Sequence, residues 1–265
     1  MFVPGIDERK IRKSITIEAD TIILDLEDSV PLGFKEEARN TVKRALSDLN
    51  WGKREICIRI NPLSTIDSYK DVSMIERLEV DCIVVPKAEA TLEELHRATG
   101  MNLIAMIETP RGFMRLEDIV SSEGVTGVTW GPADLALHMG GFEGSLDDND
   151  YLRVTIAIAA ATYDVDPIDK VYFNIRDLDG FRRDALKAKM LGYIGKMVIH
   201  PSQVSIANDV FSPSEDEIAW ARRVVKAYEE AMERGLGAIS LEGKLIDSVH
   251  YKMAKRLLER WKWLT

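Results

Sequence analysis

Two stretches decide the fold: LIAMIET at residues 103–109 and VTGVTWGPAD at residues 125–134. Each begins as a short apolar run and ends at a carboxylate, Glu108 or Asp134, where the run stops. Apolar runs of this length, bounded by turn residues, are typical of buried parallel strands. A carboxylate just past the C-terminal end of such a strand lies where α/β enzymes place their chemistry. We therefore predict an α/β protein with a site near these two carboxylates.

The two carboxylates are candidate ligands for one hard cation. Mg²⁺ is typically held by one or two carboxylates, while water and substrate oxygens complete its octahedron. Either residue alone would more simply be a surface acid at a strand end or a helix N-cap. The pair on successive strands, with Gly131 and Pro132 shaping the second loop, favours a magnesium site.

Length and charge narrow the class of protein. The chain has 265 residues, which is long for one ordinary domain but normal for an α/β barrel. A hydrophobic content of 46% is enough for a full core. The net charge of −9 argues against nucleic acid as the main partner, because binding it needs a basic face. Anionic small molecules stay possible, since they need only a local basic group.

The cysteines and the apolar segments indicate the compartment. Cys57 and Cys82 both lie inside apolar strand-like runs, so buried free thiols are predicted rather than a disulfide or a metal site. The first residues lead straight into charged sequence, without the apolar segment of a signal peptide. The longest apolar segment, near residues 154–163, is too short to span a bilayer. We therefore expect a soluble cytoplasmic protein with no membrane partner.

Apolar runs alternate with amphipathic helical patterns along most of the chain. The predicted strands are residues 2–4, 21–26, 56–60, 82–85, the two stretches quoted above, 171–174 and 196–199. Eight strands that alternate with helices indicate a (β/α)8 TIM barrel. A doubly wound nucleotide-binding fold is the alternative, but its glycine fingerprint follows none of the strands.

The sequence after the eighth strand exceeds what a barrel needs. A long helix is predicted from Ser214 to Arg234, with Ser214 and Glu217 as a capping box. A short hairpin or extended arm follows at residues 237–245, and then a last amphipathic helix over residues 249–261. We therefore divide the chain into a catalytic barrel, residues 1–209, and a C-terminal extension, residues 210–265. The extension is a candidate lid or subunit interface.

If all eight strands point the same way, their C-terminal ends define one mouth. The polar residues at these ends are Glu27, Asp28, Arg59, Lys87, Glu108, Asp134, Asn174 and His200. An unpaired arginine is costly in a buried strand, so Arg59 is either an ion-pair partner of Glu27 or Asp28 or a group that binds a carboxylate or enolate oxygen. Lys87 could form a Schiff base, although an ion pair with Glu89 or a mouth acid is the simpler interpretation.

Several motifs occur in an order that a known family shares. They are FVPG at 2–5, LDLEDSV at 24–30, Lys35 with Ala38 and Arg39, RIN at 59–61, VPK at 85–87, IET at 107–109, GPADLA at 131–136 and HPSQ at 200–203. Through them the chain resembles, over nearly its whole length, the citrate lyase beta-chain-like branch of the HpcH/HpaI aldolase superfamily. The resemblance implies a (β/α)8 barrel with a C-terminal extension, often trimeric. It also implies carbon–carbon cleavage or formation between an acyl thioester and an α-keto acid.

The resemblance assigns roles to the strand-end residues. It implies Mg²⁺ bound by Glu108 and Asp134, with Arg59 at the substrate. Glu27, Asp28 and Lys87 are expected to orient these groups.

The loop at residues 131–134 is expected to hold the keto acid through Gly131, Pro132 and Ala133. In the citrate lyase branch this loop usually reads Gly-Ser-Glu-Asp, and its backbone N–H groups help hold a carboxylate. Pro132 has no N–H, and in this the loop resembles that of the related hydroxy-keto-acid aldolases.

Asp247 is the expected acid/base. Its simple interpretation is an N-cap of the helix that begins near Val249. Malate synthase-like members of the family, however, carry a catalytic aspartate in a matching Ile-Asp segment of a neighbouring subunit's extension. The resemblance therefore implies that Asp247 acts on the thioester α-carbon in an adjacent protomer, most simply within a homotrimer. Ser248 and Val249 stand where a residue and a proline are common.

We thus expect a magnesium-dependent carbon–carbon lyase, or the reverse Claisen-type synthase, of the citryl-CoA or malyl-CoA lyase type. Its expected partners are an acyl-CoA, an α-keto acid and further copies of the chain. Two alternatives stay open. One is a pyruvate-type hydroxy-keto-acid aldolase that uses no CoA, and the other is an obligate beta subunit of a multi-component lyase.

Overall fold

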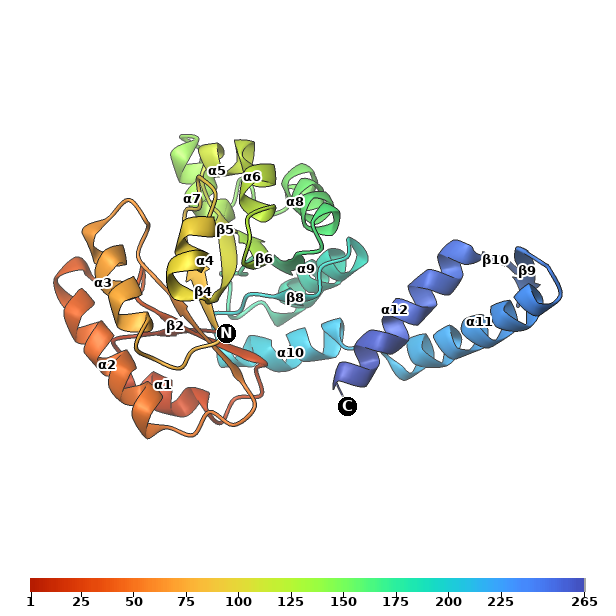
Figure 1. The fold of residues 1–265 in the computed structure, drawn as a ribbon, viewed down its shortest axis with the longest axis horizontal. Coiled ribbons are helices and arrows are strands. Elements are labelled where there is room, and N and C mark those ends of the chain that lie inside the picture. Colours follow the sequence, from red (N-terminus) through yellow and green to blue (C-terminus); the bar gives the residue numbers. More distant parts are fainter. Residues whose placement is uncertain (265) are drawn as a thin grey trace. The chain divides into compact units, whose positions relative to one another are not determined.

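The computed structural model describes residues 1–264 of the 265-residue chain, and the side chains of residues 1–262. The chain forms two compact units, Met1–Asn208 and Asp209–Thr265, which Figure 1 shows in the colours of the sequence. The boundary predicted from the sequence lies after residue 209.

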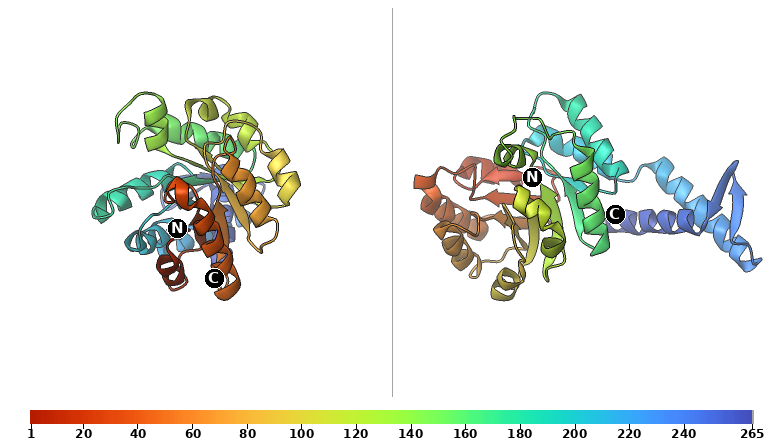
Figure 2. Two further views of the ribbon diagram at one scale, coloured as in Figure 1. Left: turned by 90° about the vertical axis from the view of Figure 1, so that its left-hand side faces the viewer. Right: turned by 90° about the horizontal axis from the view of Figure 1, so that it is seen from above.

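The first unit contains one sheet of eight parallel strands. They are β1 Phe2–Pro4, β2 Thr21–Asp25, β3 Glu55–Arg59, β4 Cys82–Val85, β5 Asn102–Ile107, β6 Val125–Trp130, β7 Asp166–Asp169 and β8 Gly195–Lys196. Each strand pairs with the next one along the chain, and the sheet is curled (Figure 2). The backbone N–H of Phe2 in β1 donates to the carbonyl of Val198, just after β8, at 2.9 Å. The predicted parallel α/β fold is therefore confirmed.

Helices connect the strands. They are α1 Glu8–Ser14, η1 Leu32–Phe34, α2 Lys35–Asp48, α3 Ile66–Ile75, α4 Glu93–Thr99, α5 Pro110–Met114, α6 Leu116–Val120, α7 Pro132–His138, α8 Asp150–Thr162, α9 Leu178–Met190 and α10 Pro201–Phe211. None of the helices in the described part of the chain is long and apolar enough to cross a membrane.

Two hydrophobic cores lie on the two faces of the sheet, because successive strand side chains point to opposite faces. In β2, Ile23 belongs to a small core with Val84, Met106 and other inward residues, while its neighbour Leu24 belongs to the large core under the helices. The run of apolar residues in β2 is thus explained by burial on both faces.

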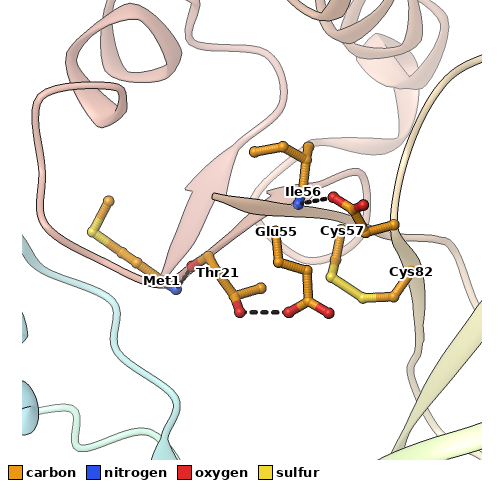
Figure 3. Close-up of a disulfide and its surroundings, with 7 residues drawn as sticks. Met1, Thr21, Glu55, Ile56, Cys57 and Cys82 are labelled. Atoms are coloured by element: carbon orange, nitrogen blue, oxygen red, sulfur yellow. Dashed lines mark hydrogen bonds between the residues drawn. A yellow bond between two sulfur atoms is a disulfide. The ribbon is translucent and has the colours of Figure 1, made fainter. Parts of the chain in front are cut away.

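Cys57 and Cys82 form a disulfide, so the prediction of free thiols is wrong (Figure 3). The two cysteines are direct partners in the register between β3 and β4, and both are fully buried. The pairing register of the sheet places the two sulfurs together, which local sequence does not reveal. Glu55 lies beside them, and these three form the group of clustered metal-binding side chains found in the described residues. With the sulfurs bonded to each other, the cysteines offer no thiolate to a metal.

The last two strands differ from their predicted positions. Strand β7 is Asp166–Asp169, whereas the apolar run at residues 171–174 follows it as irregular chain. The prediction failed because Asp166, Pro167 and Asp169 carry the composition of a turn rather than of a strand. Strand β8 is also shorter than predicted, with only Gly195 and Lys196.

The second unit is a helical hairpin with a small sheet. Helix α11, Glu215–Glu233, and helix α12, Ser248–Leu264, flank the antiparallel pair of β9, Ala238–Leu241, and β10, Lys244–Asp247 (Figure 1). Ser214 and Glu217 form the predicted capping box of α11. Tyr228 stacks on Tyr251 with ring centroids 5.0 Å apart, which joins the two helices.

Candidate active site

A cavity of about 340 Å³ opens at the C-terminal ends of the strands. Its wall includes Phe2, Asp25, Asp28, Arg59, Glu108, Thr129, Trp130 and residues 131–134. The strand-end residues Arg59, Glu108 and Asp134 therefore line one cavity, as the sequence predicts. Gly131, Pro132 and Ala133, the predicted substrate loop, form part of the same wall.

Arg59 is held by a carboxylate that sequence reasoning missed. Its Nε and Nη2 each donate to an oxygen of Asp25 at 2.7 Å, while Nη1 lies 3.0 Å from Glu27 and 3.9 Å from Asp28. The predicted partners are thus present, but Asp25 is the bidentate one. Burial alone would raise the pKa of Asp25, yet its hydrogen bonds to Arg59 outweigh burial and hold that pKa below its usual value. The guanidinium is fixed and permanently charged.

Lys87 lies between the acids of the site. Its Nζ is 2.5 Å from Glu27 and 3.4 Å from Asp134. Burial lowers the pKa of Lys87, but the hydrogen bond and charge of Glu27 outweigh burial and raise it above its usual value. A Schiff base needs the neutral amine, so this environment disfavours a Schiff-base lysine. Glu89, the other predicted partner, instead accepts a hydrogen bond from Thr109.

Glu108 is a buried carboxylate among other carboxylates. One oxygen accepts a hydrogen bond of 3.0 Å from the backbone N–H of Lys87, whose φ of 47° turns that N–H toward the site. Burial, then the charge of Glu27 and that of Asp134, raise the pKa of Glu108 to about 7. A divalent cation would relieve the repulsion among the carboxylates of Glu108, Glu27 and Asp134. The ammonium of Lys87 already lies against Glu27 and Asp134. The donor set therefore fits Mg²⁺, and Glu108 and Asp134 are the candidate ligands.

Gly131 makes room for the Glu108 carboxylate. A Cβ added at Gly131 would lie 2.7 Å from Oε1 of Glu108. We therefore expect Gly131→Ala to displace the carboxylate and to weaken Mg²⁺ binding about tenfold or more, measured by calorimetry. Gly33→Ala is the matched control, because an added Cβ there meets no atom within 4 Å. Unchanged Mg²⁺ affinity in Gly131→Ala would argue against Glu108 as a ligand.

The raised pKa of Glu108 predicts a pH dependence of metal binding. Mg²⁺ binds the ionised carboxylate, so the proton and the metal compete. With a pKa of about 7, Glu108 is mostly ionised at pH 8 and mostly protonated at pH 6. We expect Mg²⁺ to bind about tenfold more weakly at pH 6 than at pH 8, in calorimetric titrations of the intact chain. An affinity that stays constant over this range would contradict the assignment.

A buried network of ion pairs lies next to the loop at residues 131–134, and sequence reasoning missed it. The indole N–H of Trp130 donates to Asp169 at 3.4 Å. Asp169 also accepts from Arg153 at 3.2 Å and from Lys196 at 2.5 Å. A carboxylate inside a buried strand must find such partners, but residues 166–169 have the composition of a turn, so the local sequence contains no signal of this network. The network ties β6, β7, β8 and α8 together next to the cavity wall.

Two residues predicted at the mouth, Asn174 and His200, do not line the active-site cavity. Asn174 is exposed and accepts a hydrogen bond from the N–H of Arg176 in a turn. His200 bonds to Ser202 and lines a second cavity of about 310 Å³ with Phe2 and three basic residues. The basic residues are Arg9, Lys10 and Lys13. Because Phe2, Pro4 and Ile199 line both cavities, the two are adjacent.

Asp247 lies at the end of β10 in the second unit. Its Oδ1 accepts from the backbone N–H groups of Val249 and His250, at 3.0 and 3.3 Å, so it caps α12. It also lies 2.7 Å from Nδ1 of His250. The hydrogen bonds from the His250 ring and backbone lower the pKa of Asp247. The carboxylate is therefore ionised and partly exposed.

The fold and these side chains agree with a family match. The model of the HpcH/HpaI aldolase/citrate lyase family matches residues 1–201. The chain belongs to this family. The resemblance that the sequence motifs predict is thereby confirmed.

Relatives in the HpcH/HpaI family extend the match to nearly the whole chain. The (3S)-malyl-CoA thioesterase of Cereibacter sphaeroides is 33% identical over 98% of this chain and 93% of its own length. The mitochondrial citramalyl-CoA lyase of Mus musculus is 31% identical over 97% of this chain and 84% of its own. Among solved structures, protein CitE of Mycobacterium tuberculosis, in complex with magnesium, acetoacetate and coenzyme A, is 30% identical, with a TM-score of 0.85 over 98% of this chain and 96% of that one.

Proposed function

We propose that the chain is a magnesium-dependent carbon–carbon lyase, or the reverse Claisen-type synthase, acting on an acyl-CoA thioester and an α-keto acid. The observation that carries the proposal is one cavity lined by Glu108, Asp134 and Arg59. The relatives support it, because they include a citramalyl-CoA lyase and a structure with magnesium and coenzyme A.

The cavity residues divide the chemistry among them. Bound Mg²⁺ would be held by Glu108 and Asp134 and would polarise the carbonyl of the keto acid as a Lewis acid. The first-turn N–H groups of α7 have no acceptor within the helix, so those of Ala133 and Asp134 can bind the keto-acid carboxylate. Arg59 presents its charge to the oxygen of the thioester enolate.

The proton at the thioester α-carbon needs a base, and we assign it to Asp247. Its carboxylate is ionised and accessible, which a base requires. We propose that it acts on the site of a neighbouring copy in a homotrimer, with the extension as lid or subunit interface. Within each copy, we propose that the eight strands close a complete (β/α)8 barrel, because the N–H of Phe2 in β1 donates to the carbonyl of Val198 just after β8.

The second cavity suits the phosphates of CoA. Its basic residues, Arg9, Lys10 and Lys13, lie next to the first cavity together with His200. Phosphates bind best to such clustered donors. A thioester placed in the first cavity could therefore extend its nucleotide part toward these residues.

Arg59→Lys tests the role of the guanidinium. Lysine keeps the charge but loses the fork that holds Asp25 and faces the cavity. We expect kcat to fall on the order of 100-fold, with Mg²⁺ affinity nearly unchanged. Arg12→Lys, at an exposed pair with Glu8, is the matched control and should keep full activity. A near-normal rate in Arg59→Lys would make Arg59 a structural ion-pair residue only.

The proposed function is tested by a screen that follows two products at once. Malyl-CoA, citramalyl-CoA and citryl-CoA are incubated with Mg²⁺ or with EDTA, and both the acyl-CoA and the keto acid released are quantified. A lyase releases the two in equal amounts and only with the metal. Hydrolysis, as the name of the C. sphaeroides relative suggests, would release CoA without any keto acid.

The same screen, with a second assay of pyruvate and an aldehyde, separates the remaining alternatives. Condensation of pyruvate with an aldehyde, without turnover of any thioester, would identify a CoA-independent aldolase. Activity of the isolated chain on a CoA thioester would exclude an obligate beta subunit. Equal activity in EDTA would overturn the proposed function.

A further inference from the structure

The floor of the active-site cavity is apolar except for one threonine. Met106, Val171 and Met197 line it together with Thr129. Met106 and Thr129 are register partners in β5 and β6, so their side chains point to the same face of the sheet. The floor is therefore formed by the interior of the curled sheet.

The hydroxyl of Thr129 has no hydrogen-bond partner among the described residues, although the residue is fully buried. A buried hydroxyl without a partner costs free energy, and this hydroxyl is itself covered although Thr129 lines the cavity. Rotation about the Cα–Cβ bond of Thr129 exchanges its hydroxyl and methyl groups. The side chain can therefore adapt to a ligand group on the floor.

The charges around the cavity restrict which ligand group the floor accepts. The charged residues that line it in the described part of the chain are Asp25, Asp28, Arg59, Glu108 and Asp134. Arg59 is the one cation among them; its nitrogens face Asp25 and Glu27, and the proposed function already assigns its charge to the thioester enolate. Mg²⁺ bound to Glu108 and Asp134 would neutralise the charge of those two acids. One carboxylate of the substrate would bind the same Mg²⁺. A second carboxylate of the substrate would find no cation on this floor.

We propose that this floor receives the substituent on the α-carbon of the keto acid, and that it selects a short uncharged group whose hydroxyl, where present, bonds to Thr129. This inference rests on the proposed function and narrows its substrate class. Monocarboxylic keto acids, such as glyoxylate, pyruvate and hydroxypyruvate, belong to that class. Oxaloacetate, and with it citryl-CoA, is disfavoured because its second carboxylate would be buried without a counter-charge.

Binding measurements test the charge selection without relying on turnover. Pyruvate, hydroxypyruvate and freshly dissolved oxaloacetate are titrated calorimetrically into the full chain with saturating Mg²⁺. We expect oxaloacetate to bind on the order of 100-fold more weakly than pyruvate. Oxaloacetate affinity equal to or above that of pyruvate would overturn the proposal.

Variants of Thr129 test its hydrogen bond. Thr129→Val keeps the shape and removes the hydroxyl, so hydroxypyruvate should lose about tenfold in affinity relative to pyruvate. Thr129→Ser keeps the hydroxyl and should keep the wild-type ratio. Thr126→Val is the matched control, because Thr126 is an exposed residue on the same strand. An unchanged ratio in Thr129→Val would remove Thr129 from the specificity site.

The outcomes separate this inference from the proposed function. Binding of keto acids in the wrong order leaves the lyase proposal standing and overturns the floor assignment alone. If no keto acid binds in the presence of Mg²⁺, both the proposed function and the floor assignment fail.

Discussion

Glu108→Gln is expected to abolish magnesium-dependent turnover while the fold stays intact. The amide oxygen can still accept the hydrogen bond from the N–H of Lys87, but the neutral group is a poor Mg²⁺ ligand. Loss of the Lewis acid should lower kcat at least about 1,000-fold. The measurements are turnover with Mg²⁺, calorimetric Mg²⁺ binding and thermal unfolding.

The unfolding measurement has a definite expected sign. Because burial and neighbouring acids raise the pKa of Glu108 to about 7, the folded state holds a proton there that the unfolded state has released. Without metal, Glu108 therefore destabilises the fold increasingly as the pH rises from about 4.5 to 7. Glu108→Gln at pH 8 should unfold at an equal or higher temperature than the unsubstituted chain without metal.

Two controls complete this experiment. Glu123→Gln, at an exposed acid, should change neither turnover nor Mg²⁺ binding. Asp134→Asn should repeat the loss of turnover seen in Glu108→Gln. Full activity of either ligand variant would refute the magnesium site.

The first six strands could be predicted from the sequence because each contains apolar residues, and burial on both faces of the sheet makes β2, β4 and β5 almost continuous apolar runs. Strand β7 lacks such a run. Its acid Asp169 is neutralised by Arg153 and Lys196, which come from α8 and β8. Only the folded chain brings those cations to the strand, so its local composition indicates a turn instead.

The candidate site was predictable to the extent that its residues follow strands. Glu108, Asp134 and Arg59 each stand at the end of an apolar run, and a parallel sheet gathers such ends. Asp25 was missed as the partner of Arg59 because it was read as part of a strand that ends later. The register that places Asp25 opposite Arg59 is set by the pairing of β2 with β3.

The disulfide could not be predicted from the local sequence either. Cys57 and Cys82 are separated by 25 residues, and nothing in the sequence near either one indicates the other. The register of β3 against β4 makes them direct partners. The pairing of β3 with β4 therefore decides that the two cysteines form a disulfide, while the local sequence predicted only that they are buried.

Asp247→Asn is expected to abolish turnover while Mg²⁺ and keto-acid binding persist. The amide can still cap α12 through its oxygen, so the second unit should stay folded. The variant loses the carboxylate that would move the proton at the thioester α-carbon. Exchange of that α-proton with solvent deuterium, followed by mass spectrometry of the thioester, measures this step directly and should stop as well. Glu233→Gln, an exposed acid on α11, is the matched control and should keep full exchange.

Mixing variants then tests whether Asp247 serves a neighbouring copy. Asp247→Asn chains keep the metal ligands, and Glu108→Gln chains keep the base, so each restores what the other lacks only if the base acts between copies. If the two are mixed equally and subunits exchange at random, a site has an intact barrel in half of the cases and an intact neighbouring base in half of those. We therefore expect the mixture to recover about one quarter of the unsubstituted activity, while each variant alone stays inactive. Exchange is verified with chains carrying two different affinity tags. If exchange occurs and no activity returns, Asp247 acts within its own chain or has no catalytic role.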